Sequence, residues 1–321
     1  MIVKKIPCIL IGSFLAVIIG FFASVITGPV PIPFSELINP TLGLGSGSQI
    51  LYEIRMPRAL AAILVGAGLA CAGTAMQTLF RNDLADPYTL GTSAGGAVGV
   101  SLAILTGAIF LTPIAAFCGA VGSVFLVYLL AAHKRRLTTG NLLLTGIAVS
   151  MFLSSVVSVC LVISGRNMHQ IMFWLMGGLW NVSWDNIPLL LITLIPAAVL
   201  FLFSRDLNIM SCGEVETRTL GIDPEKTKLL LLGIAAGITG IVVSVSGSIG
   251  FIGLISPHIM RMIIGPDHRY LIPGAICCGA FLLLCADTVT RTWLGDFPVG
   301  IVTAFFGAPF FLMLIRRRTD L

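Results

Sequence analysis

Apolar stretches long enough to cross a lipid bilayer recur from one end of this 321-residue sequence to the other. A membrane-spanning helix needs about 20 residues. Only 10% of the residues are Asp, Glu, Lys or Arg, whereas an ordinary soluble domain carries about 25%. The runs also lack the two-residue alternation of a transmembrane β-barrel. The sequence therefore predicts an all-α polytopic membrane protein, with a single transmembrane domain over residues 1–321.

Polar residues divide the sequence into ten apolar segments. The segment 250–264 is short for a full crossing, and Pro257 interrupts it. The first segment is too long for the apolar core of a secretory signal, so we interpret it as a retained helix. The predicted helices are 6–27, 57–80, 89–107, 110–132, 141–163, 187–204, 228–246, 250–264, 272–290 and 298–315.

Basic residues in the loops predict the orientation, because short cytoplasmic loops carry an excess of Lys and Arg. With ten spans and both termini in the cytoplasm, fifteen basic residues face inward and four face outward. The inward set is Lys4, Lys5, Arg81, Lys134, Arg135, Arg136, Arg205, Arg218, Lys226, Lys228, Arg261, Arg269, Arg316, Arg317 and Arg318; the outward set is Arg55, Arg58, Arg166 and Arg291. The net charge of +5 thus follows from topology and needs no nucleic-acid partner.

Residues 81–96, RNDLADPYTLGTSAGG, contain a literal G-x-S-x-G between two apolar runs. In a hydrolase this motif lies between a strand and a helix, and no strand is predicted here. An intramembrane serine protease, with Ser93 and His258 as a dyad, is one alternative. We interpret the stretch as a cytoplasmic turn between the second and third helices, in which Asp86 caps the helix, Pro87 starts it and Ser93 packs.

The longest polar stretch, residues 205–228, is predicted to be cytoplasmic. Glu214, Glu216 and Arg218, followed by Leu220 and Gly221, fit a short amphipathic helix that a glycine ends. Such a helix is either an ordinary turn of a long loop or a lever through which one rigid body moves another.

Two polar islands are predicted on the outer face. Arg55 and Arg58 are either solvated interfacial arginines or a docking patch for an acidic partner. Further along the chain, Met168, Met172 and Met176 recur every four residues. This stripe is either core packing or an adaptable surface for a bulky ligand, because thioether side chains are flexible.

The sequence contains no recognisable motif for binding a metal ion or a nucleotide. The eight cysteines form no C-x-x-C pair, and the four histidines are not spaced for chelation. The phosphate-binding pattern G-x-x-x-x-G-K-[ST] is absent from the sequence. We therefore expect no cofactor, no metal site and no catalysis by this chain, and any nucleotide must be bound by a partner.

Nine segments, in order along the chain, resemble the FecCD-type permeases of ABC importers, which carry ferric siderophores, haem and cobalamin across the bacterial inner membrane. They cover nearly the whole sequence. The segments are RMPRAL, RNDLADPYTLGTSAGG, LLLTGIAVS, FWLMGGLW, GEVETRTLG, GSIGFIGLISPHIMR, DHRYLIPGA, ADTVTR and DFPVGIVTAFFGAPFFLML.

The resemblance implies the type II ABC importer architecture. A second permease copy or a paralogue would complete a central pathway, and a cytoplasmic ATPase dimer would drive transport. The cargo would be a metal chelate, most often a ferric siderophore and otherwise haem or cobalamin, delivered by a periplasmic binding protein. The chain itself would be a multi-pass inner-membrane transport subunit, surrounded by lipid, and not an enzyme.

The resemblance also implies roles for individual residues. Binding-protein docking falls to the outer arginines, and ATPase coupling to the short helix in 205–228. The cytoplasmic gate lies just before the fifth helix, and the pathway is lined by the fifth and tenth helices with the methionine stripe. The residues are Arg55, Arg58 and Arg291 for docking; Glu214, Glu216, Arg218, Leu220 and Gly221 for coupling; Thr138, Thr139 and Gly140 for the gate; and Met168, Met172 and Met176 for the pathway.

The sequence departs from the family pattern at two positions, where RNPLA and ELPVG are usual and Asp83 and Asp296 stand here. Asp83 adds a charge near the cytoplasmic face.

The alternative from another class is an ion-coupled secondary transporter. It would need acidic residues buried in the middle of the membrane, and only Asp287 comes near the end of an apolar span.

Overall fold

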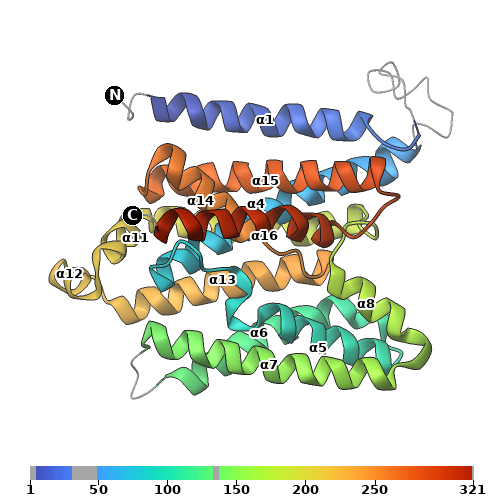
Figure 1. Cartoon of the computed structure of the whole chain (residues 1–321), viewed down its shortest axis with the longest axis horizontal. Helices are drawn as coiled ribbons and strands as arrows, with labels where there is room; N and C mark the ends of the chain where they lie inside the picture. Colours follow the sequence, from blue (N-terminus) through green and yellow to red (C-terminus); the bar gives the residue numbers. More distant parts are fainter. Residues whose placement is uncertain (1–4, 31–48, 133–136, 320–321) are drawn as a thin grey trace.

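The computed structural model describes residues 5–30, 49–132 and 137–319. Within these ranges the regular structure is helical throughout, without strands. The long helices run roughly along one direction and form a bundle (Figure 1). Four of the basic residues that were used to predict the orientation, Lys4, Lys134, Arg135 and Arg136, lie outside the described residues.

The ten predicted spans correspond to ten apolar helical segments of the described chain, seven of them long enough to cross a membrane and three shorter. The long segments are α1 (Ile6–Ile26), α4 (Met56–Phe80) with the preceding turn η2 (Ile50–Arg55), α6 (Thr112–Ala131) with η4 (Ile109–Leu111), α7 (Thr139–Ile163), η6 (Trp184–Asn186) with α9 (Ile187–Leu191) and α10 (Leu194–Leu202), α13 (Pro224–Ser246) and α15 (His268–Trp293). The shorter ones are α5 (Thr92–Leu105), α14 (Ile252–Ile264) and α16 (Val299–Thr319), the last apolar over Val299–Met313.

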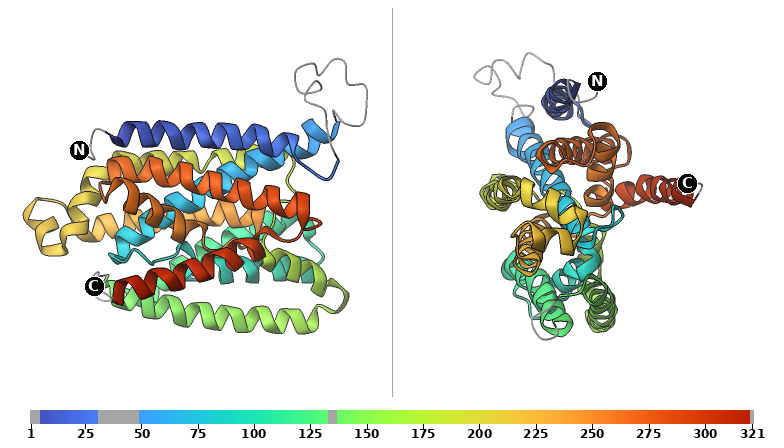
Figure 2. Two further views of the ribbon diagram at one scale, coloured as in Figure 1. Left: turned by 45° about the horizontal axis from the view of Figure 1, so that its top comes forward. Right: turned by 90° about the vertical axis from the view of Figure 1, so that its left-hand side faces the viewer.

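The ends of the bundle carry different short helices. The start of α1, the end of α16, α11 (Ser204–Cys212) and α12 (Glu214–Thr219) lie together at one end, which we call the inner end (Figures 1 and 2). The opposite, outer end carries α8 (Met168–Met176). An even number of crossings places both chain ends on one side, as the ten-span topology requires. Which side of a membrane the inner end faces stays a prediction.

Helix α4 lies at the centre of the bundle, and 89% of its most apolar stretch is buried. Small residues let its neighbours approach closely, as is usual for helices in lipid. A Cβ on Gly66 would lie 2.3 Å from the carbonyl oxygen of Gly279 in α15. A Cβ on Gly73 would lie 1.8 Å from that of Gly253 in α14. The backbones are thus in direct contact at both crossings, and no residue larger than glycine fits there.

Two breaks between helices meet inside the bundle. In the first, Asp86 Oδ1 accepts a hydrogen bond from the backbone N–H of Tyr88 (2.8 Å), and Pro87 starts the short helix η3 (Pro87–Leu90). In the second, the chain between α13 and α14 turns at residues 247–251. The Ser93 hydroxyl donates to Ser248 Oγ (2.8 Å), and the Ile249 N–H donates to the Tyr88 hydroxyl (3.3 Å). Asp86 and Pro87 thus cap and start η3, and not the third long helix as expected, because α5 begins at Thr92 after Gly91. Ser93, in the first turn of α5, binds the second break.

Helices α7 and α16 are incompletely covered by the rest of the chain. Figure 2 shows α16 standing away from the body of the bundle. Phe305 and Phe306 of α16 are 73% and 68% exposed, and Phe152 and Val162 of α7 are 64% and 84% exposed. Such apolar faces require lipid or a second protein as cover.

The close approach of α4 and α14 predicts the effect of a single methyl group. We expect Gly73→Ala to force the two backbones apart and to lower the free energy of unfolding by about 1–3 kcal/mol, the usual cost of overpacking. The matched control is Gly12→Ala on α1, where a Cβ meets nothing within 4 Å. Unfolding midpoints in detergent compare the two, and equal midpoints would contradict direct backbone contact.

Candidate functional site

A buried ion pair ties α4 to α15 at the outer end. The Arg58 Nε donates to Asp287 Oδ1 (2.9 Å) and Oδ2 (3.1 Å), and its Nη2 lies 2.9 Å from Oδ1. The same Nη2 lies 2.7 Å from Oδ1 of Asp296, which follows α15. Arg58 and Asp287 are 4% and 0% exposed, whereas Asp296 is 49% exposed. One guanidinium therefore holds one buried and one half-exposed carboxylate.

Two further arginines bind the end of α1. Arg55 Nη1 donates to the carbonyl oxygens of Val25 (3.2 Å) and Ile26 (2.8 Å). Arg291 Nη2 donates to the carbonyl oxygens of Ser24 and Thr27, the latter at 3.2 Å. The last carbonyl groups of a helix have no partner within the helix and carry partial negative charge. The buried arginines therefore supply hydrogen-bond donors to these groups.

The alternative that Arg55 and Arg58 are solvated interfacial arginines is wrong. Arg55, Arg58 and Arg291 are only 2%, 4% and 6% exposed. The physical reason is that the end of α1 and the buried Asp287 both need donors, and these side chains supply them from within the chain. Their part in docking a binding protein stays a prediction. Asp287 was noted in the sequence, but its pairing with Arg58, 229 positions away, was missed.

The methionine stripe does not belong to the core of this chain. Met168, Met172 and Met176 are 42%, 37% and 38% exposed on α8. Helix α8 contacts both α7 and α16, the incompletely covered helices. A cavity of about 610 Å³ between α8 and α16 is lined by Met176, Phe305 and neighbouring residues. Met176 thus lines a hollow that is open in the single chain, and the role of the stripe in a pathway stays a prediction.

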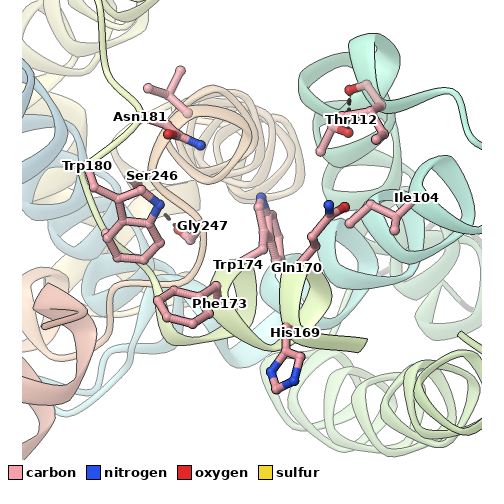
Figure 3. Close-up of a pocket in the computed structure, with 13 residues that line it drawn as sticks. Ile104, Thr112, His169, Gln170, Phe173, Trp174, Trp180, Asn181, Ser246 and Gly247 are labelled. Atoms are coloured by element: carbon pink, nitrogen blue, oxygen red, sulfur yellow. Dashed lines mark hydrogen bonds between the residues drawn. The ribbon is translucent and has the colours of Figure 1, made fainter. Parts of the chain in front are cut away.

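A second cavity, of about 500 Å³, lies on the other side of α8 (Figure 3). Trp180 lies against Gly178, where a Cβ would come within 1.6 Å of the indole ring, and it meets Phe173 edge to face at 5.6 Å. Figure 3 shows Trp174 and Gln170 of α8 between this aromatic wall and the start of α6. The cavity offers flat apolar surfaces and an amide. It was not predicted, because its walls come from four separate parts of the chain.

Helix α12 at the inner end combines intrachain ion pairs with exposed apolar side chains. Glu214 Oε1 lies 2.9 Å from Lys228 Nζ and 3.3 Å from Arg81 Nη2. The hydrogen bond from Lys228 lowers the pKa of the Glu214 carboxyl below its ordinary value. Val215 and Leu220 are 72% and 65% exposed. The helix is therefore fixed to the bundle on one side and presents apolar groups on the other.

The polar stretch 205–228 contains two short helices, where one was expected. The sequence predicted a loop over 205–228 with a short helix; the structure has α11, then α12, and α13 already begins at Pro224. Gly221 has a φ of +81° and ends the turn after α12, as predicted. Glu216 is exposed, and Arg218 Nη2 lies 3.9 Å from Glu225 Oε1. Val215 was missed in the sequence, although an apolar residue between two glutamates in a polar stretch is a usable signal.

The predicted gate residues form the start of α7. The Thr138 hydroxyl accepts a hydrogen bond from the N–H of Asn141 (3.4 Å) and caps the helix. Thr138 and Gly140 are exposed, Thr139 is half-buried, and a Cβ on Gly140 would meet nothing within 4 Å. The preceding residue, Leu137, is buried and held by α13. The gate segment is thus open on one side and anchored on the other.

The arrangement does not favour the two alternative chemistries. The Ser93 hydroxyl has a single hydrogen and donates it to Ser248, which is no general base. The acidic group expected of an ion-coupled carrier, Asp287, is bound by Arg58. Among the described residues, no group of three or more His, Cys, Asp or Glu side chains could hold a metal ion.

Comparison with known proteins gives one family. Residues 16–317 match the model of the FecCD transport family. A cobalamin import system permease protein of Halobacterium salinarum is 40% identical over 95% of this chain and 86% of its own length. A hemin transport system permease protein of Yersinia pestis is 38% identical over 98% of this chain and 97% of its own.

The fold has also been seen before. A solved chain, described as an inward-facing conformation of an ABC transporter of metal-chelate type, superposes with a TM-score of 0.88 at 31% sequence identity. The match covers 97% of this chain and 99% of the solved one. The helices of the bundle and the short helices at its ends therefore follow an architecture found in transporters.

The buried pair of Arg58 and Asp287 predicts a large loss of stability on truncation of one partner. We expect Arg58→Ala to leave an unpaired buried carboxylate and to lower the free energy of unfolding by about 3–5 kcal/mol. The double variant Arg58→Met, Asp287→Leu should recover most of the loss, because a well-packed apolar pair often replaces a buried ion pair. Unfolding midpoints in detergent measure both. The control is Arg269→Ala, which removes an exposed pair with Asp267 and should change the midpoint little.

The lowered pKa of Glu214 predicts how α12 responds to acid. A carboxyl whose pKa is depressed by folding stabilises the folded form above its unfolded pKa, and that contribution is lost as the pH falls through the folded value. We therefore expect α12 to loosen below the ordinary glutamate range. Hydrogen exchange of the amides in 214–219, corrected for the intrinsic effect of pH, measures this. Glu214→Gln should abolish the acid dependence; an unchanged profile would mean that another group controls it.

Proposed function

The chain belongs to the FecCD transport family, and on this premise we propose that it forms one half of the channel through which an ABC importer moves a metal chelate into the cytoplasm. The observation that carries the proposal is the family match over residues 16–317. The chain is a transport subunit and not an enzyme, and it is a multi-pass membrane protein. Hydrolysis of ATP belongs to a separate subunit.

Cobalamin or haem is the cargo we place first, ahead of the ferric siderophore expected from the sequence. The relatives compared above are named for cobalamin and hemin. Both ligands are large metal macrocycles. The exposed thioethers of Met168, Met172 and Met176 suit such a ligand, because methionine side chains adapt to irregular apolar surfaces.

A second permease, either another copy of this chain or a paralogue, would cover the exposed faces of α7 and α16. Those faces lie on both sides of α8, so pairing would enclose the methionine stripe between two subunits. We propose this enclosed space as the pathway, and Thr138, Thr139 and Gly140 as its inner gate. Rocking of the two halves would then expose the pathway to one side and then to the other.

The two ends of the bundle would bind different partners. At the inner end, the ATPase dimer would cover Val215 and Leu220, with α12 as the coupling helix. At the outer end, a periplasmic binding protein would meet the loops around Asp296. The buried Arg55, Arg58 and Arg291 would support those loops from below, because Arg55 Nη1, Arg58 Nε and Arg291 Nη2 already donate hydrogen bonds within the chain. The inner end then faces the cytoplasm of a bacterium, with both chain ends there.

Uptake by intact cells tests the proposed function. In cells that lack the chain, its return should restore uptake of cobalamin or haem, and ferric siderophore serves as the third probe. Uptake should continue in the presence of an uncoupler and stop when the partner ATPase is inactivated, because nucleotide hydrolysis drives it. Loss of uptake with the uncoupler alone would favour an ion-coupled carrier.

Ser93→Ala should transport at close to the unsubstituted rate; complete loss would revive the protease alternative.

A further inference from the structure

Lys228 is a lysine whose side chain is buried at the inner end of the bundle. It lies in the second turn of α13 and is 1% exposed. Burial of an ammonium group is costly unless it is paired and hydrogen-bonded. A lysine at this depth is therefore kept in place by what it binds, and its partners show what it joins.

The partners of Lys228 come from three different elements. Its Nζ donates to the carbonyl oxygen of Leu137 (2.5 Å), which precedes the gate segment. It lies 2.9 Å from Glu214 Oε1 of α12 and 3.3 Å from Glu225 Oε1 of its own helix. An ammonium group has three donors, so the three contacts use its full capacity. No water is needed to satisfy it.

A second contact fixes Leu137 from the same side. Its N–H donates to Glu225 Oε2 (2.8 Å), so both backbone groups of Leu137 are bound to side chains of α13. Leu137 itself is 4% exposed, and Thr138, the cap of α7, follows directly. The start of α7 and the start of α13 are thus held together as one unit, and Glu214 attaches α12 to that unit through Lys228.

We propose that Lys228 is a positioning residue that carries a displacement of α12 to the first turn of α7, the gate segment Thr138 to Gly140. A shift of Glu214 alone would leave the buried ammonium of Lys228 with one carboxylate partner instead of two. Movement of the attached unit with α12 preserves the contacts and is the path of lower free energy. This inference rests on the proposed function, in which α12 contacts the ATPase and the start of α7 closes the pathway.

A cysteine in the gate segment gives a direct readout of this link. Gly140→Cys is accommodated because a Cβ there meets nothing within 4 Å. The full chain is purified in lipid nanodiscs with the ATPase that accompanies it. The rate of maleimide labelling at position 140 is measured by peptide mass spectrometry, with and without ATP and vanadate, and ATP hydrolysis is measured in parallel. In the otherwise unsubstituted complex, we expect ATP and vanadate to change the labelling rate.

Three variants in the Gly140→Cys background separate a link from general damage. Lys228→Met should lose most of the ATP-dependent change in labelling while ATP hydrolysis continues. Glu214→Ala removes the α12 partner of Lys228, together with the pair between Glu214 and Arg81, and keeps the other two partners of Lys228. It should lose the same ATP-dependent change in labelling. The double variant should lose no more than the stronger single one, because both act in one chain of contacts. Lys226→Met is the matched control, since this lysine is 86% exposed and, within the described part of the chain, forms an ion pair only with Asp223.

The outcomes distinguish this inference from the proposed function. A full ATP-dependent change in Glu214→Ala, or effects that add in the double variant, would overturn the link while leaving the importer assignment intact. If Lys228→Met does not assemble, Glu214→Ala alone decides. No ATPase bound to the unsubstituted chain, or no ATP-dependent labelling change in it, would overturn the proposed function and the link with it.

Discussion

Backbone contact between α4 and its neighbours sets the distances at which the other helices can pack. In lipid, helices gain little from hiding apolar side chains, so close packing and paired polar groups must hold a bundle together. Gly66 and Gly73 allow this contact on two sides of α4, against α15 and α14. With α4 enclosed, the remaining helices lie further out, and α7 and α16 keep apolar faces that this chain does not cover. The apolar faces that need lipid or a second protein as cover thus follow from where the tightest packing is.

The charged groups of the chain are used differently at the two ends. At the outer end, Arg55, Arg58 and Arg291 are turned inward to helix carbonyls and a buried carboxylate, and they serve the fold. At the inner end, Lys228 and Glu214 join elements that meet a partner and a gate in the proposed mechanism. The charged groups at the outer end therefore stabilise the fold, whereas those at the inner end connect elements that move together in the proposed mechanism.

Much of the fold could be predicted because a bilayer imposes length and polarity on each span. All ten helices and the short helix α12 lie close to the expected positions, and even the short α14 was located. The exposure of the arginines was predicted wrongly, because the sequence does not show which carbonyls lack partners once helices end. The site at Lys228 joins residues 91 positions apart. Such contacts arise from packing in three dimensions, and one sequence carries no local signal for them.

The two carboxylates that bind Arg58 at the outer end differ in exposure, because Asp287 is buried and Asp296 is half-exposed. Asp287 cannot leave Arg58 without stranding a charge in the interior, whereas Asp296 can exchange its place with water or with another anion at little cost. Rearrangement at this end is therefore confined to the turn between α15 and α16. The helix that stands away from the body, α16, therefore begins three residues after a half-exposed ionic contact with α4.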